Sequence, residues 1–227
     1  MDWTLAIKRN RDQLKDIVLG LFVLAKMRVG GSLFTLQRDV LSAIMLVLRP
    51  AESAVRRLIL IAAHGLVLKP ATPRDFVLLG PRPEDPASTT FGDFYRIKAF
   101  KLFDPLKSFD PESIWDVQPT WESGYGLTSN FTYSTENPAE PLDATHLGQR
   151  LNALIRALDN LPHQARRLVR WQAKRDAALK AHLPTRMSPM RPGLPPGWRE
   201  RKIHEIDTVL RECHGLANDL LNAPNTS

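Results

Sequence analysis

The sequence contains a single cysteine, Cys213, among its 227 residues. One thiol excludes an intramolecular disulfide and any metal site that needs two or more cysteines from one chain. The lack of disulfides is typical of proteins from a reducing compartment. The six histidines include no pair separated by three or four residues, so the two-histidine metal motif of helices is missing as well. We therefore expect neither a metal site nor a cofactor.

Long apolar runs are also missing. The strongest ones, at 17–25, 40–48 and 58–68, are well short of the roughly twenty residues that cross a bilayer. Asp12 and Asp16 interrupt the charged N-terminal region, and no small-residue cleavage pattern follows the first apolar run, which argues against a signal peptide. These absences predict a cytoplasmic protein without a transmembrane segment.

The short motifs of common enzymes are absent too. The chain has no phosphate-binding glycine loop, no dinucleotide fingerprint, no nucleophile elbow and no zinc-protease helix. Their absence favours a non-enzymatic protein. It does not exclude an enzyme, because many catalytic sites are assembled from residues far apart in sequence.

What the chain does contain is an uneven distribution of charge. The net charge of +7 is composed of +6 over residues 1–70, −5 over 71–164, +9 over 165–203 and −3 over 204–227. Residues 165–203 hold eleven Lys and Arg against two acids. Such a concentration of positive charge attracts a polyanion, an anionic surface or an acidic protein face.

The first seventy residues predict a helical bundle. Apolar residues recur every three or four positions along 3–28, which indicates an amphipathic helix. Gly30 and Gly31 should end it, because glycine adopts the left-handed conformation of a tight reversal. A second helix is expected to reach Leu48, and Pro50 suits the first turn of a third helix. The pattern predicts a three-helix bundle.

The middle of the chain, 71–142, is rich in proline and predicts loops and short strands. Residues 95–99 alternate apolar and charged side chains, as in a half-buried strand. Two Phe-Asp-Pro triplets, at 103–105 and 109–111, predict two similar loop corners with buried rings.

The last part, 143–227, returns to helical spacing. It predicts a helix around 147–158, a basic helix over about 162–181, a Pro-rich linker at 184–197 and a final helix around 203–220. Together the segments predict a mainly α protein, with a small central loop and strand region and with C-terminal helices that pack back on the N-terminal bundle.

The basic helix carries the most informative side chains. Arg166, Arg170 and Lys174 follow one another at intervals of four, so they line up along one helix face. Such a row can contact successive phosphates, and a tryptophan beside it can stack on an exposed base. The sequence predicts that this helix and the Pro-rich tail contact nucleic acid or another polyanion through Arg166, Arg167, Arg170, Trp171, Lys174, Arg191, Trp198 and Arg199.

Other interpretations of the basic segment stay open. A row of cations is also what a solvated helix face looks like, and the acidic middle of the chain could neutralise it. The same charge would serve an adaptor that docks an acidic protein surface. Peripheral attachment to anionic lipid is less favoured, because the face opposite the arginines has few bulky apolar groups.

Two smaller patterns favour positions in the core. Cys213 falls in the apolar stripe of the final helix, and His214 is rotated about 100° from it, which favours a buried structural thiol over a nucleophile. Residues 99–103 resemble the Leu-Phe-ended peptides that dock on bacterial sliding clamps. They lack the leading Gln of those peptides and fall in the expected strand, which favours a core role.

The stretches around 49–58 and 186–214 resemble those of a group of bacterial proteins of unknown function. The resemblance implies a bacterial chromosomal protein. It brings no activity, ligand or site residue to this chain.

Overall fold

The computed structural model describes residues 3–66, 99–105 and 141–222 of the chain. They form the helices α1 (Trp3–Leu24), α2 (Arg38–Ala63), α3 (Thr145–Asp159), α4 (Leu161–Lys180) and α5 (Glu205–Asn222), with two short strands, β1 (Thr35–Gln37) and β2 (Pro141–Asp143). The expected mainly α class is confirmed. None of the described helices combines the length and the apolar character needed to cross a membrane.

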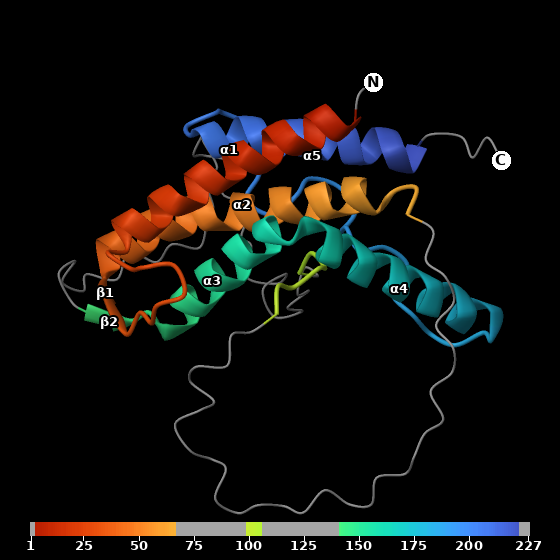
Figure 1. Ribbon diagram of the computed structural model, residues 1–227, viewed down its shortest axis with the longest axis horizontal. Coiled ribbons are helices and arrows are strands. Elements are labelled where there is room, and N and C mark those ends of the chain that lie inside the picture. Colours follow the sequence, from red (N-terminus) through yellow and green to blue (C-terminus); the bar gives the residue numbers. More distant parts are fainter. Residues whose placement is uncertain (1–2, 67–98, 106–140, 223–227) are drawn as a thin grey trace, which may run out of the picture.

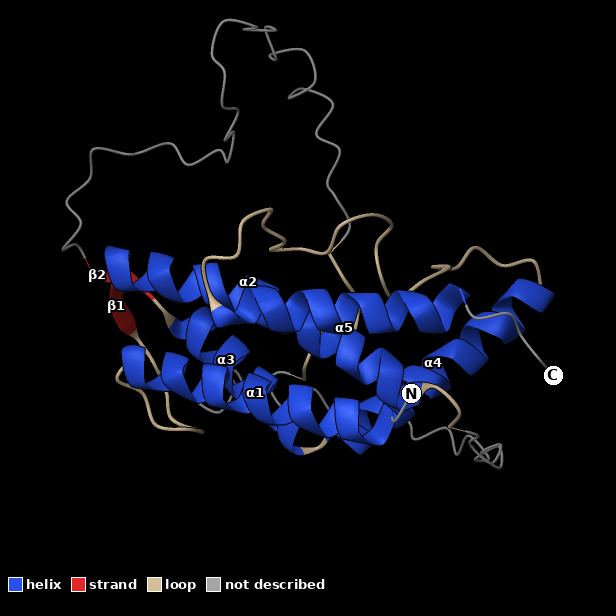
Figure 2. Ribbon diagram, turned by 90° about the horizontal axis from the view of Figure 1, so that it is seen from above, coloured by secondary structure: helices blue, strands red, loops and turns tan. Residues whose placement is uncertain are grey.

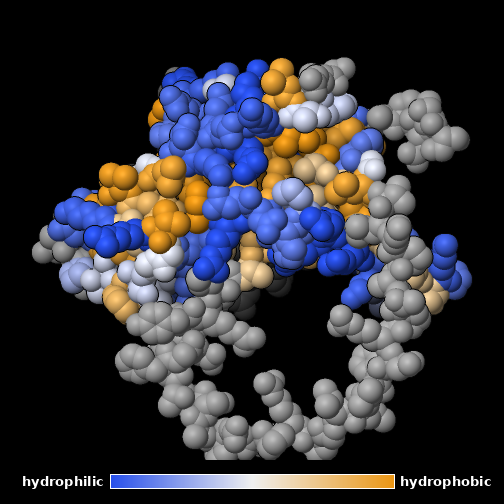
Figure 3. Space-filling model, viewed as in Figure 1, coloured by the Kyte–Doolittle hydropathy of each residue, from blue (hydrophilic) through white to orange (hydrophobic). Residues whose placement is uncertain are grey.

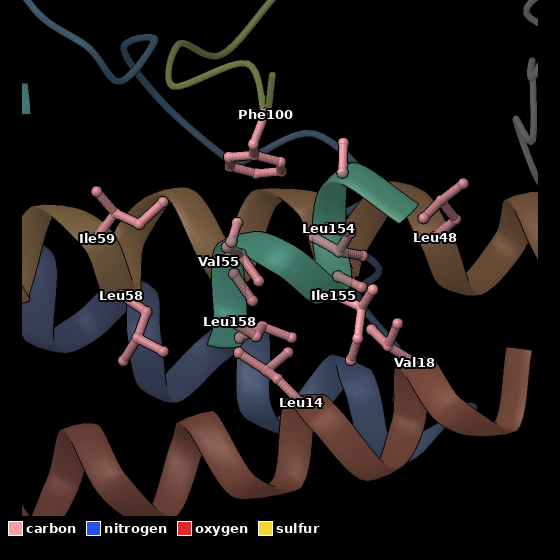
Figure 4. Packing of buried hydrophobic residues seen from close by; sticks show 14 of the residues in the cluster. Leu14, Val18, Leu48, Val55, Leu58, Ile59, Phe100, Leu154, Ile155 and Leu158 are labelled. Carbon is pink, nitrogen blue, oxygen red and sulfur yellow. The ribbon is translucent and has the colours of Figure 1, made fainter. Parts of the chain in front are cut away.

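The helix α2 forms the centre of the molecule. It packs against α1, α3, α4 and α5, while α1 also packs directly against α3 and α5 (Figures 1 and 2). Helices from both ends of the chain contribute to one hydrophobic core, in which Leu14, Leu58 and Leu158 from three different helices are fully buried (Figure 4). The prediction that the C-terminal helices pack back on the N-terminal ones is confirmed.

The predicted helix boundary at Pro50 is wrong, because α2 continues through this proline. A proline inside a helix has no N–H to donate to the carbonyl four residues before it, here that of Leu46. The structure replaces the missing donor from outside the helix, since the guanidinium of Arg199 donates to the Leu46 carbonyl oxygen. The Pro-rich tail lies directly on this position. A Cβ on Gly197, which has a φ of +80°, would come within 2.7 Å of the Pro50 nitrogen. The N-terminal part therefore has two helices instead of three.

The first helix ends at Leu24, before the predicted stop at Gly30 and Gly31, and Lys26 takes the left-handed conformation there with a φ of +51°. The glycine pair forms a separate turn that is held by a distant side chain. Gly30 has a φ of +81°, a conformation that glycine adopts without a steric penalty. The buried Asn152 of α3 accepts a hydrogen bond from the Gly30 N–H at 2.8 Å and donates one to the Gly31 carbonyl at 2.9 Å. The turn after α1 is thereby fixed against α3.

The small sheet joins the middle of the chain to the start of α2. The strands β1 and β2 are antiparallel, with Leu36 opposite Leu142. Of the predicted central features, residues 95–98 and 109–111 lie outside the described residues. Residues 99–105 are irregular, so the strand expected to include Ala99 does not reach this segment. Phe100 and Leu102 are buried, as expected of core residues.

Candidate functional site

The helix α4 has a buried side and a cationic side. Leu161, Ala165 and Leu168 face the core. Arg166, Arg170 and Lys174 are exposed on the opposite side. Arg166 donates to the Pro162 carbonyl of its own helix at 3.3 Å. Within residues 3–66, 99–105 and 141–222, none of these three cations is paired with a carboxylate. We call these three residues the α4 row.

Within α4, small side chains lie beside the α4 row, and the helix's one acid lies off it. By the 100° rotation per residue of a helix, Ala173 and Ala177 lie on the same face as the row, and both are exposed. Asp176, the one acid of α4, projects to another side, where it pairs with Arg175 at 2.7 Å. Figure 3 shows hydrophilic side chains gathered over α4. The row spans eight residues, or about 12 Å along the helix axis.

The other predicted residues of α4 have partners inside the protein. Trp171 is half-buried, and its ring lies 4.9 Å from that of Phe103, while the guanidinium of Arg175 lies 5.5 Å from its centroid. Arg167 is half-buried and donates to Gln164 Oε1 at 2.6 Å and to the Phe100 carbonyl at 3.4 Å. Both side chains connect α4 to the segment 99–105.

The predicted residues of the Pro-rich tail also have internal partners. The guanidinium of Arg191 donates to the Leu194 carbonyl at 2.9 Å. The ring of Trp198 lies 4.8 Å from the guanidinium of Arg211 and contacts His214 edge-on. Arg199 pairs with the buried Asp207 at 3.2 Å, besides its bond to α2. Five of the eight predicted site residues therefore contact other parts of the protein, and the α4 row projects outward.

A buried ionic cluster, which the sequence analysis did not identify, lies beneath the tail. Arg57 is fully buried, and Asp104 is 1% exposed. Arg57 Nη2 donates to Asp104 Oδ2 at 3.0 Å, and its Nη1 donates to the Ser53 hydroxyl and carbonyl at 2.8 and 2.9 Å. Arg56 Nη1 approaches Asp104 Oδ1 at 3.4 Å. Burial lowers the pKa of Arg57, and the charge of Asp104 opposes that effect.

The cluster extends to α5 through a histidine. Arg57 Nε donates to His214 Nδ1 at 3.2 Å, which requires this nitrogen to be unprotonated. Burial and the positive charge of Arg57 both lower the pKa of His214. The neighbouring Cys213 is fully buried, and burial together with Glu212 raises its pKa to about 12. The thiol is thus protonated at neutral pH and unsuited to nucleophilic attack.

A groove of about 940 Å³ lies beside the cluster, between α3, α4 and the segment 99–105. Its acids, within the described part of the chain, are Glu52 and Asp104. Glu52 accepts two hydrogen bonds from Arg150, at 2.8 and 3.1 Å. The cations that line the groove, among the described residues, are Arg56, Lys101, Arg150, Arg167 and Arg186. In the part of the chain that the structure describes, no three His, Cys, Asp or Glu side chains gather as metal ligands would.

A signal for the buried cluster was present in the sequence. Arg56 and Arg57 stand between the apolar residues of 54–55 and 58–61, in a helix that is apolar nearly all round. Adjacent arginines in such a run require buried acceptors, because an unpaired charge is too costly to bury. The Phe-Asp-Pro triplet at 103–105 supplies the acid, although nothing in its spacing connects it to α2.

Comparison of the chain with protein-family models, with curated proteins and with solved structures gives no match. The resemblance to a group of bacterial proteins therefore stays a prediction, as does the cytoplasmic location. The functional assignment rests on the chain's own geometry.

Proposed function

We propose that this protein is a non-enzymatic nucleic-acid-binding protein whose α4 row contacts the phosphate backbone. The observation that carries the proposal is the alignment of three exposed cations that have no carboxylate partner in the described residues. Cations that are already paired would have to give up their partners before they could bind phosphate. Arg166, Arg170 and Lys174 would give up water and counterions instead of a carboxylate, and the release of counterions favours binding to nucleic acid.

The shape of this face supports a backbone contact. Ala173 and Ala177 beside the row are small, so that a polyanion can approach the helix closely. The side chains that could have stacked on bases, Trp171 and Trp198, are occupied by Phe103 and by Arg211. We therefore expect binding with little dependence on base sequence, since phosphate contacts position a protein but do not specify bases.

The first test is a salt titration with labelled duplex and single-stranded nucleic acid, and with heparin as competitor. Three phosphate contacts predict that the logarithm of the binding constant falls with the logarithm of salt concentration with a slope of about −2.7 for duplex DNA and about −2.1 for a single strand. The variant Arg166→Ala, Arg170→Ala, Lys174→Ala should lose most of this slope and most of the affinity at low salt.

A matched control removes the same charge elsewhere. Lys8, Arg201 and Lys202 are exposed and lie outside α4. The variant with alanine at these three positions should keep a salt-titration slope within about one unit of the wild type. Charges that do not touch the nucleic acid act on it at long range, and this attraction is screened within roughly 10 Å at 0.1 M salt. Equal losses in both triple variants would mean that net charge, and not the α4 row, determines binding.

Two outcomes would contradict the assignment. Binding to heparin as tight as to nucleic acid would reduce the function to general polyanion affinity. No binding at low salt would leave the adaptor interpretation, in which the row docks an acidic protein surface.

A further inference from the structure

The groove beside the buried cluster has features that the proposed nucleic-acid contact does not use. We propose that it binds a small organic anion, with a carboxylate or phosphate group facing Arg167 and Arg186 and an apolar body lying against Phe100 and Ala153. This site is separate from the α4 row, because the three residues of the row do not line the groove.

The charge of the groove is the first argument. Among the described residues that line it, five are cations and two are acids, an excess of three positive charges. Both acids already have partners, since Glu52 holds Arg150 and Arg56 while Asp104 holds Arg56 and Arg57. Arg167 and Arg186 have no carboxylate partner in the described part of the chain. An anionic group in the groove would supply the missing negative charge.

The second argument is that the guanidinium groups are held in place yet keep donors to spare. Arg186 donates through Nε and Nη2 to the carbonyls of Ser188, Asp104 and Pro189, and it lies 5.2 Å from the Phe103 ring centroid. Toward the described residues, Arg167 donates through Nη1 alone. Each guanidinium has five N–H donors. The remaining donors of Arg186 and Arg167 meet no acceptor among the residues described, and their fixed stems reduce the entropy lost when an anion binds.

The third argument concerns the apolar part of the ligand. Phe100, Leu102 and Ala153 line the groove together with the arginines. A volume of about 940 Å³ is at the upper end of the range for small-molecule sites, which combine an apolar lining with a few polar groups. Inorganic phosphate would fill a small fraction of it. The lining therefore fits an anion that carries an aromatic or aliphatic body.

The test uses the full chain and three probes in isothermal titration calorimetry: phenyl phosphate, inorganic phosphate and benzyl alcohol. Phenyl phosphate should bind about tenfold more tightly than inorganic phosphate, because its ring removes apolar surface from water. Benzyl alcohol, which lacks the charge, should show no measurable binding. Equal affinities for the two phosphates, or no binding of phenyl phosphate, would overturn the proposal.

Two variants locate the site by different means. Arg167→Gln with Arg186→Gln removes two charges and should weaken phenyl phosphate binding at least about tenfold, as expected for charge-assisted hydrogen bonds. Ala153→Leu fills the groove without changing its charge, and it should weaken phenyl phosphate while leaving inorganic phosphate bound. Thermal melting of each variant checks the fold. If the arginine variant does not fold, Ala153→Leu decides, and unchanged phenyl phosphate affinity in it would refute the site.

A control separates this proposal from the proposed function. Arg166→Gln with Arg170→Gln also removes two charges, both from the outward face of α4. It should weaken nucleic-acid binding and leave phenyl phosphate binding unchanged. Loss of phenyl phosphate binding in this variant would show that the probe binds the α4 row, and would overturn the assignment to the groove.

Discussion

The helix α4 carries six cations, and the tail at 184–203 that follows it carries five. The two sets of cations have different surroundings. In the tail, Arg186 donates to three backbone carbonyls, Arg191 to one, and Arg199 to the Leu46 carbonyl and to Asp207. On α4, Arg170 and Lys174 are exposed and have no hydrogen-bond partner in the described ranges.

The difference follows from how each segment satisfies its own backbone. A helix pairs its carbonyls internally, so cations on its surface find few acceptors there. The tail is irregular, and its carbonyls need donors from elsewhere. Guanidinium groups, with five donors each, meet that need. Arg186, Arg191 and Arg199 of the tail therefore hold the fold together, whereas the cations of the α4 row are exposed to solvent.

The largest expected effect comes from removing the acid beneath the tail. Asp104→Ala leaves the fully buried Arg57 without its carboxylate and removes the acceptor of the Arg191 N–H. Breaking a buried ion pair on one side costs about 3–5 kcal/mol of unfolding free energy. Urea denaturation followed by circular dichroism measures the loss, and a variant already unfolded in buffer would agree with it.

An exposed ion pair is the control for Asp104→Ala. Asp176 pairs with Arg175 on α4, and its side chain is 55% exposed. Asp176→Ala should change the unfolding free energy by less than about 1 kcal/mol, because solvent screens such pairs. Similar losses in the two variants would contradict the contrast between the tail and α4.

The sequence predicts the parts of this fold that depend on local pattern. Apolar spacing identifies α1, α3 and α5, and the row Arg166, Arg170, Lys174 follows from helix periodicity alone. The turn at Gly30 is also predictable, because a glycine pair permits it, although α1 ends earlier than predicted, at Leu24. These features need no knowledge of distant residues.

The features that the sequence does not predict all depend on a distant partner. Pro50 appeared to begin a helix because the donor that replaces its N–H is Arg199, 149 positions further along the chain. The burial of Trp171 depends on Phe103, and that of Arg57 on Asp104. No periodic pattern connects residues so far apart, and the segment 99–105 that joins them is irregular.

The next largest effect is expected at the proline of α2. Arg199→Ala removes the donor to the Leu46 carbonyl and the partner of the buried Asp207. Losing a hydrogen bond to a charged group costs about 1.5–3 kcal/mol. If Arg199 acts by replacing the proline's missing N–H, Pro50→Ala should lower the cost of Arg199→Ala by about 1 kcal/mol, since residue 50 then donates to that carbonyl itself.

A double-mutant cycle measured by urea denaturation gives this coupling. The exposed neighbour Arg201 supplies the control, because Arg201→Ala should lie within about 0.5 kcal/mol of the wild type in either background. Additive effects of Pro50→Ala and Arg199→Ala would mean that Arg199 acts only through Asp207.

The smallest effect concerns the histidine at the inner end of the cluster. The pKa of His214 is lowered in the folded protein, first by burial and then by Arg57, from its ordinary value of 6.5. Below pH 6.5 the unfolded chain therefore binds a proton that the folded protein resists. Since stability rises with pH wherever the unfolded state binds more protons, this contribution is complete above pH 6.5 and is lost as pH falls toward the folded pKa. The change should stay below about 1 kcal/mol, because the ring is half-buried and partly screened.

His214→Asn keeps an acceptor for Arg57 Nε but cannot titrate. Urea midpoints measured from pH 7.5 to 5.5 should fall less in His214→Asn than in the wild type. The lowered pKa of Asp207 does not interfere, since its effect appears only near and below its ordinary value of 3.8. Parallel pH profiles for the two proteins would show that the bond from Arg57 to His214 has no part in stabilising the cluster.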